Sequence, residues 1–386
     1  MRLGACAGAP DREHWRVLKK PRGIARGNVR SGAGMTKQHT DQTKKPLGLA
    51  IVGLGMAHKP HVEALRNLAA EVRILHCHAP SAERRKSFGE KHPDLPLTEQ
   101  FQSILDDPAV DVVLILTPPF SHRDLVLACA KAGKHVLLEK PLDVSTERAW
   151  ESVRAMEAAD LRFGVVFQHR FRHASQILRR LVQSGDLGEL VSGSASIRWW
   201  RSFEYFAEPG RGMKARDGGG VLLTQAIHTL DLFLSLTGPV KEVAAMARTS
   251  KLRSIDTEDV AAAAVEFANG AIGAIDATTV SFPGQPERIE LACTKGTAIL
   301  SVEELTVHFM DGRVLHEAGS AQGGGGADPM AFSCAAHQAQ IADFLEAVRT
   351  HRPPQCSGRD AVRVLGLIEA MLESSTSGKA VSITQS

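Results

Sequence analysis

A lysine at the end of an apolar strand is the first residue of this chain that suggests chemistry. Residues 134–142 read KHVLLEKPL, and the apolar centre of this segment predicts a buried strand. The strand ends at Glu139, Lys140 and Pro141, because proline cannot continue the hydrogen-bond ladder of a central strand. In open parallel α/β sheets, ligands bind beyond the carboxyl ends of the strands. We therefore expect Lys140 to be catalytic and Glu139 to adjoin a cofactor, although an ion pair between the two would explain them structurally.

A histidine much further along the chain offers a second reactive group. Three glycines at 218–220 precede an apolar helical stretch that carries Thr224, His228 and Asp231. The spacing of i, i+4 and i+7 predicts that these three side chains share one helical face. Imidazole titrates near neutral pH, which suits His228 to proton exchange with an alcohol. The alternative is a histidine whose hydrogen bonds are satisfied within a protein core.

A glycine turn near the start of the folded chain indicates a nucleotide site. The apolar run 47–52 ends in Gly53, Leu54, Gly55 and Met56. Such a turn between a strand and a helix lets backbone amides approach a pyrophosphate at the positive end of the helix. His58 stands where the usual third glycine would be, so the dinucleotide fingerprint is incomplete. An ordinary tight turn is the alternative.

The residues after the second predicted strand bear on the choice between NAD and NADP. Dinucleotide-binding domains usually offer a carboxylate there to the ribose hydroxyls. This chain has Ser81, Arg84 and Arg85 instead, which could face a 2′-phosphate. We expect NAD or NADP as the cofactor, with a slight preference for NADP. Exposed arginines at the start of a surface helix would explain the pattern equally well.

The fourth predicted strand, 110–116, also ends in candidate ligand contacts. Thr117, Pro118 and His122 follow it on the side of the sheet where ligands bind, and we expect all three to contact the cofactor.

The order of the predicted elements indicates two domains. Strands alternate with helices over 46–160, including helices at 82–91 and 101–106, which predicts a right-handed, mostly parallel sheet. Beyond residue 160 strand-like runs dominate, among them 162–168, 190–200, 240–248 and 260–267, and Asn269-Gly270 marks a hairpin. We therefore expect an α+β domain with a large, mostly antiparallel open sheet over 161–384. Its last two helices, at 335–350 and 360–374, could pack back on the first domain.

The composition fits a globular chain of this organisation. The 386 residues are 43% hydrophobic and 23% charged, with a formal net charge of +3. This small charge gives no reason to expect a nucleic-acid partner, and we see no run apolar enough for a membrane span. Residues 1–45 are basic and lack a hydrophobic period, so we expect a disordered extension. The six cysteines have no metal-site or disulfide spacing, which indicates a reducing cytoplasm and no metal.

Together these motifs resemble the glucose–fructose oxidoreductase/inositol dehydrogenase (Gfo/Idh/MocA) family over about residues 47–384. The resemblance rests on the glycine turn at Gly53 with His61 beyond it, Thr117-Pro118 with His122, Glu139-Lys140-Pro141, and the glycine-launched helix with His228 and Asp231. It implies an N-terminal Rossmann domain and a C-terminal open sheet that is often buried in a homodimer or homotetramer. It also implies NAD(P)-dependent oxidation or reduction of a sugar, sugar derivative or cyclitol. The lysine would orient the reacting hydroxyl and the cofactor, and the histidine would serve as acid–base catalyst.

The chain departs from the family pattern at Thr224, where many relatives carry an aspartate. Threonine cannot hold a negative charge against Lys140, which leaves Lys140 and His228 as the catalytic pair. Runs 168–172 and 199–201 also match family segments at the cleft. They imply a cofactor contact at Gln168 and substrate contacts at Arg170, Trp200, Arg201, Thr224 and His228. The alternative for each of the two arginines is a structural ion pair.

Two other functions fit the same resemblance. One is a glycosidase that retains its NAD, and the other is a non-catalytic regulator that binds a dinucleotide.

Overall fold

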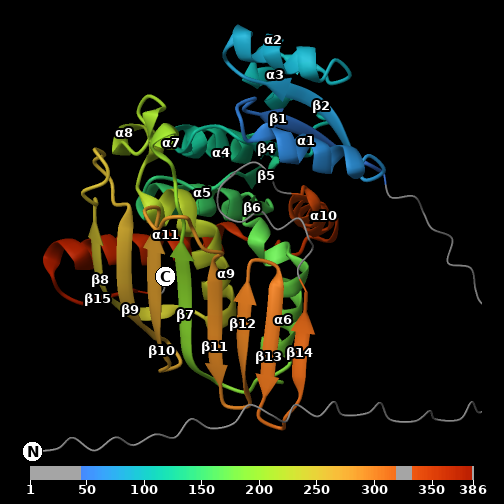
Figure 1. Cartoon of the computed structure of the whole chain (residues 1–386). Helices are drawn as coiled ribbons and strands as arrows, with labels where there is room; N and C mark the ends of the chain where they lie inside the picture. Colours follow the sequence, from blue (N-terminus) through green and yellow to red (C-terminus); the bar gives the residue numbers. More distant parts are fainter. Residues whose placement is uncertain (1–44, 319–332, 385–386) are drawn as a thin grey trace, which may run out of the picture. The chain divides into compact units, whose positions relative to one another are not determined.

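The computed structural model describes residues 45–318 and 333–384 (Figure 1). The expected disordered extension, 1–45, lies outside the described residues except for Lys45.

The first sheet has six parallel strands in the order β3-β2-β1-β4-β5-β6. This order matches the predicted parallel Rossmann sheet, and its direction reverses between β1 and β4, the point at which open α/β sheets bind ligands beyond the carboxyl ends of their strands. The strands are β1 Leu47–Val52, β2 Val72–His78, β3 Leu97–Thr98, β4 Val112–Ile115, β5 His135–Leu138 and β6 Phe163–Val165. The helices around them are α1 His58–Asn67, α2 Ala82–Lys91, α3 Phe101–Asp106, α4 His122–Lys131 and α5 Thr146–Ala158.

The strand expected over 162–168 is shorter than predicted. β6 pairs with β5 only as far as Val165, after which the chain enters a 3₁₀ turn over Gln168–Phe171. The amide of Val165 donates instead to Cys356 O, so a C-terminal segment adjoins this edge of the sheet. Gln168 therefore lies on a turn, and the first sheet continues past the expected boundary at residue 160.

The second sheet has nine strands in the order β14-β13-β12-β11-β7-β10-β9-β8-β15. The pairings are antiparallel except between β7 and β10, and the predicted hairpin at Asn269-Gly270 joins β9 to β10. The strands are β7 Leu190–Arg198, β8 Val240–Arg248, β9 Val260–Phe267, β10 Ile272–Thr278, β11 Arg288–Cys293, β12 Gly296–Ser301, β13 Glu304–Phe309, β14 Val314–Glu317 and β15 Val381–Ser382. The two short edge strands, β14 and β15, were not expected from the sequence.

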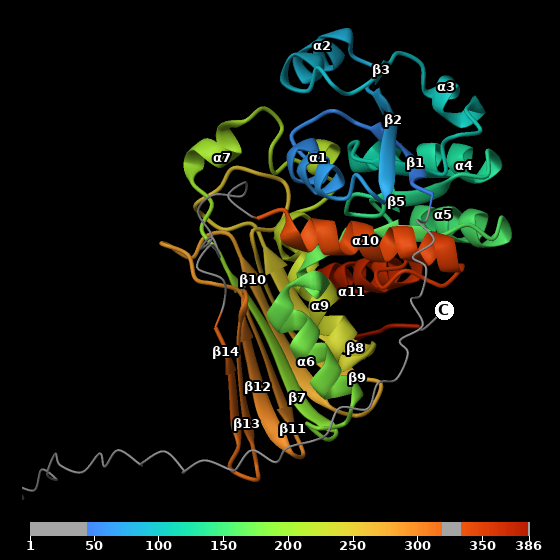
Figure 2. The same ribbon diagram turned by 90° about the vertical axis from the view of Figure 1, so that its right-hand side faces the viewer.

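Helices cover one face of the second sheet (Figure 2). They are α6 His173–Gln183, α9 Ile227–Thr237 and α11 Gly358–Ser377, and two short helices, α7 Phe203–Ala207 and α8 Lys214–Asp217, precede α9. Strand residues alternate accordingly: Val243, Ala261 and Ile275 face the helices and are buried. α11 begins earlier than predicted because Ser357 and Asp360 form a capping box at its N-terminus.

The helix α10, Ala335–Thr350, lies against the first domain although it comes late in the chain. Asn67 Nδ2 on α1 donates to Gln338 Oε1 at 3.0 Å, and Arg349 Nη2 donates to Glu71 O at 2.7 Å. This packing brings residues of α10 to the ligand edge of the first sheet.

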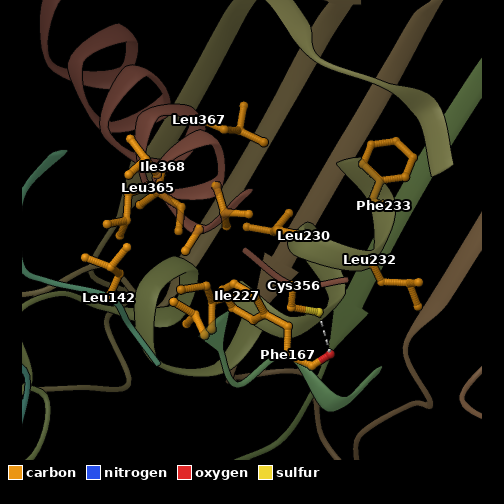
Figure 3. Packing of buried hydrophobic residues seen from close by; sticks show 14 of the residues in the cluster. Leu142, Phe167, Ile227, Leu230, Leu232, Phe233, Cys356, Leu365, Leu367 and Ile368 are labelled. Atoms are coloured by element: carbon orange, nitrogen blue, oxygen red, sulfur yellow. Dashed lines mark hydrogen bonds between the residues drawn. The ribbon is translucent and has the colours of Figure 1, made fainter. Parts of the chain in front are cut away.

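The larger of two hydrophobic clusters among the described residues joins the two sheets. Figure 3 shows part of it, where Phe167 from the end of β6, Ile227 and Leu230 of α9, and Leu365 and Ile368 of α11 lie together. The position of α9 is therefore fixed by packing against both domains.

The helical stretch Lys214–Thr237 is long and apolar enough to cross a membrane, a possibility that we did not expect from the sequence. Its most apolar window is 78% buried inside the protein. Core helices pass the same length and hydropathy test, so this stretch is weak evidence for a membrane span.

Candidate active site

The three glycines before α9 serve close packing. Gly218 has φ of +79°, which favours glycine, and a Cβ at Gly220 would lie 2.0 Å from Glu258 O. Glu258 O accepts the amide of Val221, and Glu258 Oε1 accepts the amide of Leu222. The glycines thus let the segment of Glu258 hold the first turn of the helical stretch.

That first turn is a π-helix over Leu222–Ala226, which leads directly into α9. A π turn is wider than an α turn, so the expected α spacing between Thr224 and His228 does not hold. The Thr224 hydroxyl donates to Gly220 O at 2.7 Å and also contacts Gln225 Oε1. The winding at Thr224 thus differs from the predicted α-helix, and the expectation that Thr224, His228 and Asp231 share one face stays a prediction.

Lys140 reaches the π turn from the other domain. It follows β5 at the carboxyl edge of the first sheet, and its Nζ donates to the carbonyl oxygen of Thr224 at 3.0 Å. The bond between Lys140 and Pro141 is cis. Burial and the charge of Arg211 lower the pKa of the Lys140 amine, while Glu139 raises it. The predicted catalytic lysine thus lies beside the helical stretch that carries His228.

Glu139 is held by histidines from two other elements. His61 on α1, fully buried, donates through Nε2 to Glu139 Oε1 at 2.8 Å, and the second oxygen accepts the amide of Lys140 at 3.0 Å. The ring of His337 on α10 packs edge-to-face against that of His61, with centroids 5.0 Å apart. Although burial acts to raise it, the hydrogen bond from His61 and the nearby positive charges lower the pKa of Glu139 to about 2.

The donor atoms of His61, Glu139 and His337 lie within 4.8 Å of one another, a spacing at which a metal ion could bind. We expected no metal site from the sequence. Both oxygens of Glu139 are already hydrogen-bonded within the protein, which accounts for its position without an ion.

His228 lies beside a second buried histidine. The ring of His169 is 5.0 Å from that of His228, and His169 Nε2 accepts a hydrogen bond from Arg172 Nη2 at 2.7 Å. Arg172 in turn donates to Glu287 Oε1 at 2.7 Å. Burial, with the charge of Lys140 next in importance, holds the pKa of His228 well below its usual value. His228 is therefore a neutral imidazole at neutral pH, able to accept a proton.

Arg170 does not read a substrate anion in this arrangement. Its guanidinium binds both oxygens of Asp231, at 2.6 and 2.5 Å, and donates to Gln355 O at 3.0 Å. Because Asp231 is fully buried, it needs this cation as a partner, and the structural alternative for Arg170 is the better account.

Trp200 and Arg201 lie in an aromatic and cationic cluster at the end of β7. The Arg201 guanidinium packs over Trp199 and Tyr205, with ring centroids at 5.0 and 5.8 Å. Trp200 packs edge-on against Phe203 and Phe282. Gln225 Nε2 on the π turn donates to Tyr205 Oη at 3.3 Å, so this cluster adjoins the turn that Lys140 contacts.

The glycine turn after β1 forms a cradle. Gly53 has φ of +103°, and a Cβ there would lie 2.6 Å from Leu116 C and 2.8 Å from Thr117 N. By contrast, no atom lies within 4 Å of the place that a Cβ on Gly55 would occupy. Leu54 is buried and Met56 is exposed. The turn therefore packs against β4 on one side and leaves open space at Gly55, as a bound pyrophosphate requires.

The two arginines after β2 differ in whether their side chains are bonded within the protein. Ser81 caps α2 by accepting the amide of Arg84, whose side chain is exposed. Arg85 is engaged elsewhere, with bonds to Ala79 O, Pro80 O and Glu99 Oε1. Of the two arginines, Arg84 is thus the one with a side chain available to a 2′-phosphate.

His122 does not face a ligand. It is fully buried, with Nδ1 3.0 Å from Pro141 O and Nε2 2.7 Å from Thr117 O. Burial lowers the pKa of His122 although the backbone carbonyls beside it act to raise it, and the ring lies between the ends of β4 and β5. The expectation that it contacts the cofactor directly was wrong, since its polar atoms are used within the protein. Thr117 and Pro118 remain at the carboxyl end of β4, beside the Gly53 turn.

Four residues of the site were not singled out from the sequence: His169, Arg172, Glu287 and His337. His169 and Arg172 lie in the run 168–172, so the residue types beside Gln168 could have suggested them. Glu287 and His337 come from distant segments, and only the tertiary fold brings them to the site.

These residues fit a dinucleotide cofactor. The open space at Gly55 lies between β1 and β4, at the reversal of strand order, and Gln168 Oε1 at the neighbouring edge is buried without a hydrogen-bond partner among the described residues. Gly53, Gly55, Thr117 and Gln168 would hold the cofactor, with Lys140 and His228 at its reactive end.

Two family profiles match the chain. The one described as the oxidoreductase family with an NAD-binding Rossmann fold matches residues 47–167, and the GFO/IDH/MocA C-terminal domain matches 175–299. D-apiose dehydrogenase from Paraburkholderia graminis is 28% identical over 357 residues, covering 89% of this chain and 92% of that protein. Myo-inositol 2-dehydrogenase from Thermotoga maritima is 26% identical over 331 residues, covering 82% and 92%.

A solved structure of levoglucosan dehydrogenase in complex with NADH shares the fold, with a TM-score of 0.79 at 22% identity. The match covers 89% of this chain and 100% of that one. The resemblance seen in the motifs is thus confirmed along both domains, and the chain belongs to the GFO/IDH/MocA family of NAD(P)-dependent oxidoreductases.

Proposed function

We propose that this enzyme transfers hydride between NAD or NADP and a hydroxyl or keto carbon of a sugar, sugar derivative or cyclitol. The observation that carries the proposal is the 3.0 Å contact between Lys140 Nζ and Thr224 O, because it unites the cofactor edge of one domain with the His228 helix of the other. The relatives named as dehydrogenases of D-apiose and myo-inositol support polyhydroxylated substrates.

The protein's part in the reaction is proton transfer and positioning. When bound, the nicotinamide supplies the two-electron acceptor. His228 accepts the hydroxyl proton while the carbonyl group forms, and in the reverse direction it returns that proton. Lys140 donates a hydrogen bond to the same oxygen and stabilises the negative charge that develops on it. The low pKa of His228 keeps it neutral and ready to act as the base.

A substrate panel tests this function. Purified enzyme is mixed with individual sugars, sugar acids and cyclitols, each with NAD⁺ and with NADP⁺, and the absorbance of the reduced cofactor is followed. We expect turnover with at least one polyol. The reverse assay uses keto sugars with the reduced cofactors. No absorbance change in either direction, from protein that binds the cofactor, would contradict the proposal and favour a regulator. Product formation with no net change in cofactor would favour a glycosidase.

We further propose that the second sheet forms a homodimer or homotetramer interface. The face of the sheet away from α9 and α11 carries a group of exposed small or apolar residues, Ala244, Met246, Ala262, Ala264, Ile272 and Ala274. A contiguous apolar patch of this kind marks a protein interface. Light scattering after gel filtration should give a dimer or tetramer, and Ala264→Arg should give a monomer. A monomeric wild-type enzyme would refute this.

The cytoplasm is the compartment that we propose. The five cysteines in the described part of the chain are all free and buried, as expected of a protein kept in a reducing environment. Cell fractionation tests this, and recovery of the enzyme from a membrane or secreted fraction would contradict it.

A further inference from the structure

The amine of Lys140 has a fixed partner on the helical stretch of the other domain, and that partner is a backbone group. Lys140 Nζ donates to the carbonyl of Thr224, while the Thr224 hydroxyl is turned to Gly220 O and Gln225 Oε1. The side chain of residue 224 therefore takes no part in the contact.

The carbonyl that Lys140 contacts belongs to the π turn. In an α-helix the carbonyl of residue i accepts the amide of residue i+4, whereas a π turn shifts the partner to i+5. Such π turns are frequent at functional sites. Thr224 is the central residue of the π turn Leu222–Ala226, and Glu258 holds the start of that turn through two hydrogen bonds.

We propose that the π turn presents the Thr224 carbonyl to Lys140 as a positioning group, which fixes the amine beside His228 without forming an ion pair. This inference rests on the proposed function and adds to it the means by which Lys140 is oriented. With one N–H directed at the carbonyl, the amine retains its other hydrogen positions for the substrate oxygen.

The charges around the amine are few. Glu139 precedes Lys140, and its carboxylate accepts hydrogen bonds from His61 and from the Lys140 amide. Arg211, in the loop after α7, adds a positive charge that lowers the pKa of Lys140. His228 and His169, both of low pKa, lie within electrostatic range of Lys140 and carry no charge at neutral pH. A carboxylate introduced at position 224 would thus add a new negative charge near an amine whose acidic neighbour, among the described residues, is Glu139.

The test compares Thr224→Asp with Thr224→Asn, which have the same shape and differ in charge. An opposite charge nearby stabilises the protonated lysine, so T224D should raise the pH at which Lys140 loses its proton by about one unit or more. T224N should leave that pH where it is in the wild type, whatever its effect on rate. The pH profiles of kcat and kcat/KM report the shift in the working enzyme.

A second readout needs no substrate. Acetic anhydride acetylates neutral amines, so the labelling of Lys140, followed by mass spectrometry across pH and normalised to exposed lysines in the same digest, gives its titration directly. We expect the labelling midpoint to rise in T224D alone. A crystal structure of the wild-type enzyme with NAD(P) should also show the π turn and Nζ within hydrogen-bond distance of Thr224 O.

Three results would overturn the inference: no rise in T224D although its crystal structure places the new carboxylate beside Lys140 Nζ, an equal rise in T224N, or a lysine directed away from the carbonyl in the wild-type crystal structure. Labelling and crystallography remain informative if no substrate is found, so a failure of the proposed function can be told apart from a failure of this inference.

Discussion

Arg170 and Asp231 form a buried ion pair with two hydrogen bonds, of 2.6 and 2.5 Å, between the turn after β6 and helix α9. Asp231 lies one helical turn beyond His228, so the pair anchors the helix that carries the proposed base. Burial raises the pKa of Asp231 to about 6 although Arg170 opposes this, so burial is the larger of the two effects.

Removal of Arg170 should therefore destabilise the protein strongly. Arg170→Ala leaves Asp231 buried without a counter-charge, and we expect the free energy of unfolding to fall by about 3–5 kcal/mol in denaturant titrations. The double variant Arg170→Met with Asp231→Leu replaces both charges by apolar groups and should lose less than the single variant. Equal losses in the two proteins would show that the charge pairing is not the cause.

The two glycines of the β1 turn should respond differently to alanine. In Gly53→Ala the new Cβ would lie 2.6 Å from Leu116 C, so the melting temperature should fall together with cofactor affinity. In Gly55→Ala the Cβ enters open space, so folding should be kept while the affinity for NAD(P) falls at least tenfold. Calorimetry and fluorescence titration measure the two effects, and a Gly55→Ala enzyme that binds the cofactor normally would move the pyrophosphate site elsewhere.

Arg84 should decide the preference between the cofactors. It is exposed at the start of α2, whereas Arg85 is engaged by two carbonyls and Glu99. In Arg84→Ala, kcat/KM with NADP should fall about tenfold through the loss of a charge-assisted contact, and kcat/KM with NAD should be kept. Arg73→Ala changes another exposed arginine and serves as the control. A loss that is equal for both cofactors would contradict the assignment.

His337 should make stability depend on pH below neutrality. Burial, with His61 next in importance, lowers the pKa of His337 to about 4 from an ordinary value of 6.5. As the pH falls, this histidine is protonated in the unfolded chain before it is protonated in the folded protein. Its contribution to the free energy of unfolding is therefore fully present above pH 6.5 and is lost as the pH falls towards 4. The loss should be of the order of 1–3 kcal/mol.

The variant His337→Asn cannot take up this proton, so its melting temperature should fall less between pH 6.5 and 4 than that of the wild type. His173→Asn changes an exposed histidine and should keep the wild-type dependence. If both variants follow the wild-type curve, His337 does not carry the effect.

Much of the fold could be predicted because its signals are local. The bounds predicted for α2, α3 and α10 and for strands β8 and β9 are those that the structure has. Lys140 could be placed at a site because proline ends its strand, and Gly53 because its turn joins a strand to a helix. These features depend on residues that are adjacent in the sequence, so they can be predicted from a single sequence.

The parts that could not be predicted depend on tertiary contacts. The pairing of Arg170 with Asp231 joins the turn after β6 to α9, and neither segment of the sequence indicates the partner. The π turn at Thr224 is set by Glu258 through the close approach at Gly220, so an α-helical spacing rule could not reveal it. His337 reaches the site because α10 packs on α1.

The central claim is that Lys140 and His228 act together on one hydroxyl group. The most direct measurement is the turnover of Lys140→Met and His228→Asn with the best substrate of the panel, alongside their affinity for NAD(P). General acid–base catalysis contributes about 10²–10⁴-fold, so kcat should fall by that factor in each variant. Cofactor affinity should stay within a few-fold of the wild type. Full turnover in either variant, with the fold intact, would contradict the account.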